Sequence, residues 1–544
     1  MEVPGNLADT VRRNAQIAAK GVNRTAIVWR NHEYTWTETD ELVDAYARGL
    51  RQLGLKPGNP HPARVAIAVP NRPEFVTVYF AVLRAGLIAV PLNPGYTGRE
   101  LHELLTDSGA SVLVATPNVL AALREQDATP SDLAHVYVVG DDSNSADPRA
   151  GERPIAALAM PGEPIAADTG GEDVAVLLYT SGTEGRPKGA MLSHRALLAN
   201  HAQVAAIAPP PIGADDVVLL AVPLFHAYGL NSALGAVAYH GATGVLVDPS
   251  DATGALHAIR ASGVTSLIGV PTMYSAWAQA AASEATNVDV FASVRVAVSG
   301  AAPLDVAVAR RFEAVAGQAI QVGYGLTETA PVVTTTLASP VPKDGSIGRV
   351  LPGVDVRLIG AGGTQIWRSD APASAAANDF DDDAAGSPGT DPGEISVRGA
   401  NLFSGYWPDG RDAPDSDGWW ATADVAYADA DGDLFLVDRL RQLILVHGFN
   451  VYPAEVEQVL VMHPAVAEAA VVGVPHEPSG QTVKAYVVAR SDVTAAELAD
   501  HCAHNLARFK CPTEYEFVAE LPHSVTGKVR RAALGDIAAA AVDG

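Results

Sequence analysis

The feature that most constrains the fold is a series of short, uninterrupted apolar runs between about residue 25 and residue 360. Helical patterns such as Pro73 to Ala85 and Ala252 to Ser262 separate the runs. An apolar run without alternation indicates a strand buried on both faces, and strands that alternate with helices usually pair in parallel. The sequence therefore predicts an α/β fold with more than one sheet, whose strands are RVAIAV, SVLVAT, VAVLLYT, VVLLAV, ATGVLVD, TSLIGV and VRVAVSG.

Length and a change of pattern near the C-terminus predict a second, smaller domain. A chain of 544 residues is too long for one hydrophobic core. The pattern changes near Asp438 and Arg439, after which we expect a small α+β domain. Its predicted helices cover 454–462 and 494–506, and its predicted strands are AEAAVVGVP, TVKAYVVAR and 515–518.

The segment 362–393 interrupts the alternation. It is rich in Ala, Asp, Gly and Pro and has no apolar periodicity. Such a composition is typical of a disordered, solvated loop. We expect this loop to lie between strands at 354–359 and 394–398, and we assign it no chemistry.

Composition excludes several classes of protein. The net charge of −25 argues against nucleic acid, because nucleic-acid binders present basic faces. The N-terminus lacks the apolar core of a secretory signal, and no apolar stretch is long enough for a spanning helix. The two cysteines, Cys502 and Cys511, indicate neither a disulfide framework nor a zinc cluster. We therefore expect a cytoplasmic protein, with peripheral membrane contact and a homodimer left open.

The segment LLYTSGTEGRPKGAMLSH, from Leu177 to His194, is typical of a phosphate-binding loop. A predicted buried strand leads into small and hydroxylated residues, and Arg186 and Lys188 add positive charge. Backbone N–H groups and hydroxyls can surround phosphate oxygens while the cations offset their charge. Ser193 is a predicted N-cap for a helix that begins at His194. The candidate phosphate-binding residues are Thr180, Ser181, Gly182, Thr183, Gly185 and Lys188.

This loop differs from a Walker A loop, since Lys188 precedes a glycine and Pro187 interrupts the run. Taken alone, it also fits an ordinary surface loop of Gly and Ser. Further segments decide between these interpretations. They are PLFHAYGL (223–230), SGAAPL (299–304), GYGLTET (323–329), GWWATADVA (418–426), DRLRQLILVHGFNVYPAEVE (438–457) and PHSVTGKVRR (522–531).

With the phosphate loop, these segments appear in the order found in the adenylate-forming superfamily. The chain resembles its acyl-CoA synthetases over nearly the whole length, the fatty-acid CoA ligases in particular. The resemblance implies a reaction in two steps, which first joins a carboxylate to the α-phosphate of ATP. Because both reactants are anions, catalysis is expected to depend on positioning and charge neutralisation.

The resemblance assigns roles at the triphosphate and the metal. Glu328 would hold Mg²⁺, with Thr183 in the loop that contacts the phosphates. One glutamate suffices because Mg²⁺ takes few protein carboxylates besides phosphates and water. Lys528 would bridge the attacking carboxylate and the α-phosphate. An ordinary solvated acid at Glu328 and a basic tail at Lys528, where Arg530 and Arg531 follow, are the alternatives.

The resemblance also assigns the nucleotide contacts. Tyr324 would stack on adenine, and Asp424 would accept hydrogen bonds from the ribose hydroxyls. The family more often has Gly where this chain has Ala423, which we expect to shift the loop slightly. The remaining nucleotide-binding candidates are Gly300, Ala301, Ala302, Gly325, Thr327 and Arg439.

The second step would transfer the acyl group to coenzyme A. In the family, the small domain swings about a hinge for this step. The implied division is an N-terminal adenylation domain over 1–437, a hinge over 438–441 and a mobile C-terminal domain over 442–544. Arg441 stands at the hinge position, where Lys or Asp is commoner, followed by Gln442 in place of an acid. The path of the incoming thiol would be lined by His447, Gly448 and Phe449.

The acid to be activated is predicted from PLFHAYGL. Relatives that activate amino acids carry an aspartate there, whereas this chain has His226, which favours an acid without an amine. His226 is a candidate gate of the acyl channel, and a structural histidine is the alternative. We expect a fatty acid of medium or long chain. The alternatives are an aryl or dicarboxylic acid, a carrier protein as acceptor, and a catalytically silent nucleotide- or acyl-CoA-binding protein.

Overall fold

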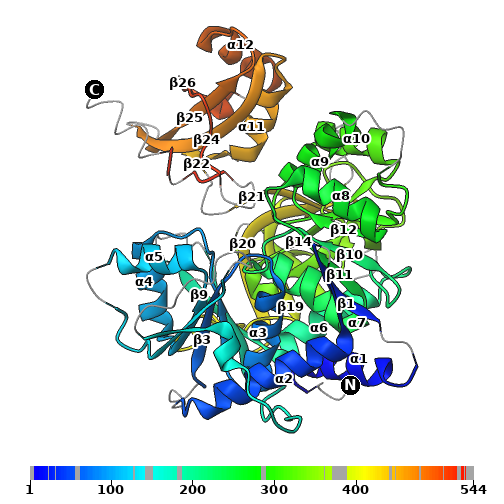
Figure 1. Ribbon diagram of the computed structural model, residues 1–544. Coiled ribbons are helices and arrows are strands. Elements are labelled where there is room, and N and C mark those ends of the chain that lie inside the picture. Colours follow the sequence, from blue (N-terminus) through cyan, green and yellow to red (C-terminus); the bar gives the residue numbers. More distant parts are fainter. Residues whose placement is uncertain are drawn as a thin grey trace. The chain divides into compact units, whose positions relative to one another are not determined.

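The fold is described from a computed structural model, and it agrees with the predicted class, an α/β protein with several sheets (Figure 1). The description covers residues 5–21, 24–30, 32–55, 62–126, 129–140, 151–180, 187–283, 290–360, 362–370, 389–439, 444–446, 449–451, 453–476, 480–506, 508–523, 529–531 and 533–534.

The chain forms two compact units. The first comprises 1–344, 348–354 and 398–420, and the second comprises 345–347, 355–397 and 421–544. The division places part of the region before 437 with the C-terminal residues. The predicted hinge at 438–441 stays a prediction, since 440–443 lie outside the described residues.

A nine-stranded sheet forms the centre of the first unit. Its central strands pair in parallel, while β2, β15 and β16 at the two edges are antiparallel. The parallel pairing follows from the alternation of strands and helices that the sequence predicts. The strand order is β16 (Arg349–Val350), β15 (Val332–Thr335), β14 (Ile320–Gly325), β13 (Val296–Ser299), β12 (Ser266–Gly269), β10 (Val217–Leu220), β11 (Thr243–Leu246), β1 (Thr25–Trp29) and β2 (His32–Thr35).

A seven-stranded sheet completes the first unit. All its strands are parallel except the last, β9, which is antiparallel to β8. The order is β7 (Glu152–Pro154), β6 (His135–Val138), β5 (Val112–Ala115), β3 (Arg64–Ala68), β4 (Ile88–Pro91), β8 (Val174–Thr180) and β9 (Lys188–Ser193).

Helices cover both faces of the seven-stranded sheet. Alternate side chains of a strand point to opposite faces. Ala66 and Ala68 of β3 pack in the cluster that includes α4 and α5, while Val65 and Ile67 pack in the cluster that includes α2 and α3. The helices of the first unit are α1 (Asp9–Ala18), α2 (Trp36–Gln52), α3 (Pro73–Arg84), α4 (Gly98–Ser108), α5 (Pro117–Arg124), α6 (His194–Ala205), α7 (Ala236–His240), α8 (Ala252–Ser262), α9 (Pro271–Ser283) and α10 (Val306–Ala316).

The predicted cap of α6 is confirmed. The Ser193 hydroxyl accepts a hydrogen bond from the Ala196 N–H at 3.1 Å, and the helix begins at His194. This bond satisfies one of the free N–H groups of the first turn.

Among the described helices, none is long and apolar enough to cross a membrane.

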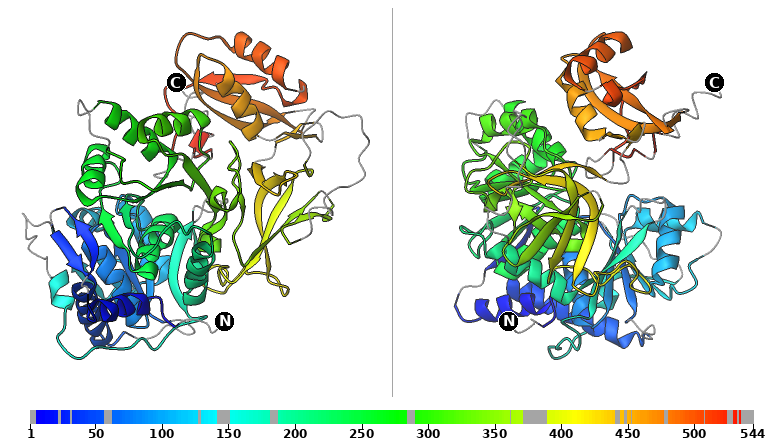
Figure 2. Two further views of the ribbon diagram at one scale, coloured as in Figure 1. Left: turned by 90° about the vertical axis from the view of Figure 1, so that its right-hand side faces the viewer. Right: turned by 180° about the vertical axis from the view of Figure 1, so that it is seen from behind.

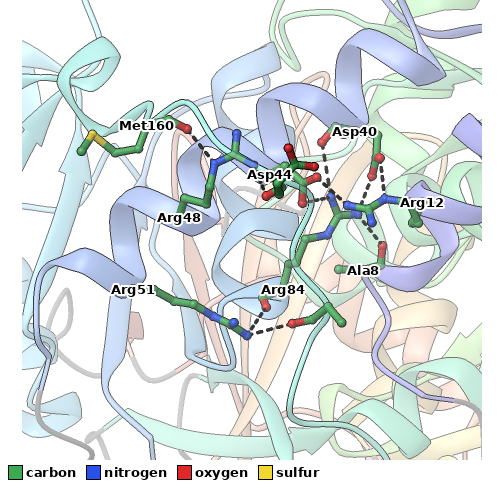
Figure 3. Close-up of polar contacts among 10 residues, drawn as sticks. Ala8, Arg12, Asp40, Asp44, Arg48, Arg51, Arg84 and Met160 are labelled. Atoms are coloured by element: carbon green, nitrogen blue, oxygen red, sulfur yellow. Dashed lines mark hydrogen bonds and ion pairs between the residues drawn. The ribbon is translucent and has the colours of Figure 1, made fainter.

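A buried ion cluster joins α1, α2 and α3 (Figure 3). The side chain of Arg84 is 2 % exposed and forms ion pairs with Asp40 at 2.7 Å and Asp44 at 3.0 Å. It also donates to the carbonyl of Ala8 at 3.1 Å. Arg12 reaches the other oxygens of both aspartates, at 2.6 Å each. Every charge in this cluster therefore has an opposite charge within contact distance.

The second unit contains most of a five-stranded sheet and all of a small C-terminal sheet. Helices α11 and α12 belong to the same part of the chain as the C-terminal sheet (Figure 2). Their buried side chains share one core with those of β24 and β25. The five-stranded order is β18 (Gln365–Arg368), β17 (Val354–Ile359), β19 (Gly393–Gly399), β20 (Trp419–Ala428) and β21 (Leu434–Arg439). The C-terminal elements are β22 (Ile444–Val446), β23 (Phe449–Val451), α11 (Pro453–Met462), β24 (Val466–His476), β25 (Gly480–Ala489), α12 (Ala495–Asn505) and β26 (Glu514–Phe517).

The prediction of a disordered loop over 362–393 is wrong at 365–368, where a strand forms, while the strand predicted at 394–398 is confirmed. Strand β18 pairs with β17, with Trp367 opposite Leu358, and β19 begins at Gly393. The strand contains only two large apolar residues, Ile366 and Trp367, and two residues do not form a recognisable apolar pattern. The composition of the segment therefore did not predict a strand. The remainder, 371–388, lies outside the described residues.

Candidate active site

The sheet topology brings three of the singled-out segments to one edge. Strands β14, β13, β12 and β10 are neighbours and run parallel, so their C-terminal ends share an edge. The segment at 299–304 follows β13, the segment at 223–230 follows β10, and GYGLTET includes the end of β14. In α/β sheets, ligands bind at the carboxyl ends of parallel strands.

Close approach explains the small residues after β13. A Cβ built on Gly300 would lie 2.9 Å from the ring of Tyr228, so a side chain there would collide with the aromatic ring. The Tyr228 hydroxyl donates to the Val298 carbonyl at 3.1 Å, which fixes the ring in place. Ala301 has φ +66°, a conformation that costs energy for any residue but glycine. Such strain is typical of functional loops.

Tyr324 and Glu328 lie on either side of a tight turn. Tyr324 is 9 % exposed and pairs with Thr334 of β15. A Cβ on Gly325 would lie 1.8 Å from the carbonyl oxygen of Pro331, so only glycine fits there. Thr327 begins a short 3₁₀ helix, η3 (Thr327–Thr329), which carries Glu328.

Glu328 is a buried carboxylate with a single hydrogen-bond donor. It is 7 % exposed, and its Oε1 accepts from the Tyr406 hydroxyl at 2.6 Å. Within the described ranges, the side chain has no other hydrogen bond and no ion pair. A buried charge is costly unless a counter-charge or metal compensates it.

Strands β8 and β9 flank the predicted phosphate loop, and Thr180 and Lys188 lie opposite each other in this pair. The Thr180 hydroxyl donates to the Lys188 carbonyl at 3.4 Å. Lys188 Nζ lies 3.5 Å from an Asp412 carboxylate oxygen and 5.0 Å from the centroid of the Tyr406 ring. The predicted loop residues Ser181, Gly182, Thr183 and Gly185 lie outside the described residues.

The segment 403–412 brings Tyr406 and Asp412 to these residues, and no sequence motif singled it out. The Trp407 N–H donates to the Gly189 carbonyl at 2.8 Å, so the segment runs along β9. Its letters, FSGYWPDGRD, show the glycines and proline of a turn but nothing that points to a carboxylate 78 residues earlier.

His226 lies after β10, in the turn that begins at Pro223. Its Nδ1 accepts a hydrogen bond from the Tyr228 N–H at 3.2 Å. Burial lowers the pKa of His226 to about 4, so the imidazole is neutral at neutral pH. A neutral ring has one N–H to offer a ligand and no charge to attract a carboxylate. Its role as a gate stays a prediction.

Asp424 and Arg439 belong to the second unit, where they are opposite each other in the β20–β21 pair. Asp424 is 5 % exposed, and its N–H donates to the Thr422 hydroxyl at 3.1 Å. Ala423 has φ +63°, which explains in physical terms why glycine suits this position better. Phe449 lies in β23 opposite Val446, and its side chain, like Arg441, His447, Gly448 and Lys528, is outside the described residues.

The donor set at Glu328 fits Mg²⁺ held together with phosphates. Among the residues that the structure describes, no group of three His, Cys, Asp or Glu side chains could hold a metal. A single carboxylate with one open oxygen is therefore no self-sufficient metal cage, but it matches the few protein ligands that Mg²⁺ takes on nucleotides. Glu328 would hold the ion, which would neutralise charge on the phosphates.

Comparison with known proteins identifies the family. The profile described as AMP-binding enzyme matches residues 14–407, and AMP-binding enzyme C-terminal domain matches 455–528. The chain is 34% identical to a long-chain-fatty-acid–CoA ligase of Yersinia pestis over 98% of this chain and 95% of that protein. It is 35% identical to a feruloyl-CoA synthase of an Amycolatopsis species, over 93% and 94% of the two chains.

A solved structure agrees with this assignment. ATP-bound MatB from Rhodopseudomonas palustris has a TM-score of 0.80 and 29% identity, covering 98% of this chain and 99% of that one. Both parts of the chain are thus matched, and the resemblance seen in the motifs extends to the fold. The chain belongs to the AMP-binding enzymes, the adenylate-forming superfamily, as one of its acyl-CoA ligases.

Proposed function

We propose that this enzyme converts a fatty acid to its coenzyme A thioester with ATP. A carboxylate oxygen of the acid attacks the α-phosphorus, and pyrophosphate leaves. The thiol of coenzyme A then attacks the acyl carbon, and AMP leaves. The observation that carries the proposal is the buried Glu328 carboxylate, open at one oxygen, at the sheet edge where GYGLTET ends.

The chain's own residues would supply charge and position for the first step. Lys188 presents an ammonium group beside the strand end that leads into the phosphate loop, and Thr180 presents a hydroxyl there. Thr183 and Lys528 keep the roles that the motifs assign to them. Such groups accelerate the reaction by opposing charge as it develops on the phosphate.

For the second step, we propose that the small domain rotates about Arg441. His447, Gly448 and Phe449 would then line the path of the thiol. A thiol with a pKa of about 8.5 needs little activation to attack a mixed anhydride, so no dedicated base is required. Cys502 and Cys511 are free thiols, which supports a cytoplasmic location as part of the same proposal.

The choice of a fatty acid is supported by two observations. Two long-chain-fatty-acid–CoA ligases align with 97% and 98% of this chain. In addition, PLFHAYGL offers His226, neutral at neutral pH, and no carboxylate for a substrate amine. An α-amino acid would leave its ammonium group unpaired in such a pocket.

An aryl acid is the second candidate, favoured by a cluster of aromatic rings. Tyr228, Tyr274 and Trp277 are buried beside the ends of β12 and β13, and the Tyr274 hydroxyl donates to Val298 at 2.8 Å. A Cβ on Gly269 would lie 3.0 Å from the rings of Tyr274 and Trp277. We propose that an aryl acid would bind next to these rings, because aromatic rings pack favourably against one another. The match to feruloyl-CoA synthases points the same way.

A thioester-formation screen tests the proposal. Purified enzyme is given ATP, Mg²⁺ and coenzyme A with acids from acetate to long chain, together with benzoate, ferulate and malonate. The highest kcat/KM is expected with a medium- or long-chain fatty acid. A maximum with ferulate or benzoate would replace the fatty acid by an aryl acid. Acyl-adenylate that passes only to a carrier protein would exclude coenzyme A as the acceptor.

A further inference from the structure

Tyr406 connects two groups that the motifs assign to the nucleotide. Its hydroxyl donates to Oε1 of Glu328 at 2.6 Å, a short bond typical of a hydroxyl on a carboxylate. The face of its ring lies 5.0 Å from Nζ of Lys188, within the range of a cation–π interaction. One side chain thus contacts both the candidate metal ligand and the cation beside the phosphate loop.

The backbone around Tyr406 is held rigidly. The Met191 N–H donates to the Gly405 carbonyl at 3.1 Å, and the Tyr406 N–H donates to the Arg411 carbonyl at 2.8 Å. Gly405 has φ +96°, and a Cβ there would lie 2.2 Å from the Gly410 carbonyl oxygen. Phe403 packs edge-on against the Tyr406 ring at 5.1 Å. The ring and its hydroxyl are therefore fixed relative to β9.

The two oxygens of Glu328 differ in their surroundings. Oε1 accepts the hydrogen bond from the Tyr406 hydroxyl, whereas Oε2 has no hydrogen bond or ion pair within the described part of the chain. A carboxylate that is free to rotate loses entropy when it binds a metal, and a partner that fixes one oxygen removes part of that cost. The bond from Tyr406 selects the rotamer in which Oε2 remains available.

We propose that Tyr406 is a positioning residue for the metal site. It orients Glu328 so that Oε2 faces Mg²⁺ on the phosphates of ATP, and its ring holds Lys188 beside the same phosphates. Asp412, at 3.5 Å from Lys188, is a second contact of the same ammonium group. The inference rests on the proposed nucleotide site and adds a residue that the family motifs quoted above do not include.

The test is Tyr406→Phe, which keeps the ring and removes only the hydroxyl. Calorimetry measures ATP binding as a function of Mg²⁺ concentration in the absence of acid and coenzyme A. We expect the half-saturating Mg²⁺ concentration to rise about 10- to 100-fold, as is typical when a group that orients a metal ligand is lost. Binding of AMP without metal is expected to stay within about twofold, since the ring and Lys188 remain in place.

Thr265→Val is the control. Its hydroxyl also donates to a carboxylate at 2.6 Å, that of Asp216, in the same compact unit and outside the segments assigned to the nucleotide. The Mg²⁺ dependence should not change in this variant. A thermal scan of both variants shows whether the fold is retained. Tyr406→Leu, which also removes the ring, should additionally weaken ATP binding through Lys188.

A double variant separates positioning from a general structural effect. In a Glu328→Ala background, Tyr406→Phe should have no further effect on the Mg²⁺ dependence, because the oriented group is gone. The inference is overturned if Tyr406→Phe leaves the half-saturating Mg²⁺ within twofold of the wild type, or if ATP binding by the wild type does not depend on Mg²⁺. Failure of every fatty acid in the thioester screen would instead overturn the proposed substrate, while the Mg²⁺ measurement still decides the role of Tyr406.

Discussion

Arg84 and Glu328 are both buried charges, but the chain surrounds them in opposite ways. Arg84 contacts two aspartates and a carbonyl, and Arg12 completes the pairing of those aspartates. Glu328 receives one hydroxyl and keeps an open oxygen. A cluster that only stabilises the fold can be saturated with partners, whereas a binding site must leave a position for its ligand. The difference supports, without reference to any motif, the proposal that Arg84 is structural and that Glu328 binds a ligand.

The largest effect is expected from breaking the saturated cluster. Arg84→Met leaves Asp40 and Asp44 buried with one cation in place of two, and removing one partner of a buried pair costs about 3–5 kcal/mol. Urea unfolding should show this loss in the free energy of unfolding. The control is Arg310→Met, whose ion pair with Asp344 is 75% exposed on both sides, and it should change stability by less than about 0.5 kcal/mol. Equal effects of the two variants would contradict the contrast.

A second test concerns His194, a neutral buried residue near the ion cluster. It asks whether the folded protein also keeps a proton from binding to this ring. The His194 ring accepts from the Leu7 N–H at 3.1 Å, and burial lowers the pKa of His194 from 6.5 to about 4, while Asp173 raises it slightly. The unfolded chain then binds more protons, so stability is full above pH 6.5 and falls as the pH drops toward 4. This histidine accounts for roughly 3 kcal/mol of that loss.

His194→Gln should therefore flatten the stability curve between pH 7 and pH 4 by that amount. Chemical unfolding at closely spaced pH values gives the slopes of the two proteins. His504→Gln is the control, since His504 is largely exposed, as its 73% side-chain exposure shows. Parallel curves for wild type and His194→Gln would mean that the ring is protonated without cost in the folded protein.

Neutralising Glu328 should slow pyrophosphate release and leave the free energy of unfolding nearly unchanged. Glu328→Gln keeps an oxygen for the Tyr406 hydroxyl but loses the negative charge. We expect pyrophosphate release to fall by about 100-fold or more, the size seen for lost electrostatic contacts in active sites. The free energy of unfolding should change by less than about 1 kcal/mol or increase, because an uncompensated buried charge disappears. A large loss of stability would place Glu328 with Arg84 as a structural group.

The sequence predicted the parts of this contrast that are local. The seven apolar runs became β3, β5, β8, β10, β11, β12 and β13, since burial on both faces leaves a continuous apolar pattern in each strand. Ser193 was recognisable as a cap because capping involves residues three positions apart. Glu328, Tyr324 and the glycines near them could be singled out as candidates because their motifs are contiguous.

The parts that depend on distant pairing could not be predicted. Tyr406 reaches Glu328 across 78 positions, and its neighbours Gly405 and Pro408 indicate only a turn. The antiparallel strand β9 was not predicted either, because its residues were interpreted as the end of the phosphate loop. The same limit applies to β18, whose strand character comes from pairing with β17. Sequence patterns record burial and local hydrogen bonds, whereas partners chosen by the fold leave no local period.

The smallest expected effect concerns the strain of a backbone conformation, where the earlier tests concerned side-chain charge. Ala423 adopts φ +63° immediately before Asp424, and a left-handed conformation costs a non-glycine residue about 1 kcal/mol. Ala423→Gly removes that strain but increases the freedom of the unfolded chain, so a net stabilisation of up to about 1 kcal/mol is expected. Thermal unfolding measures it. Ala428→Gly, in the same strand without a positive φ, should instead destabilise the protein. Destabilisation by both variants would show that the strain at Ala423 is already relieved by its surroundings, including the bond from its N–H to Glu394 at 3.1 Å.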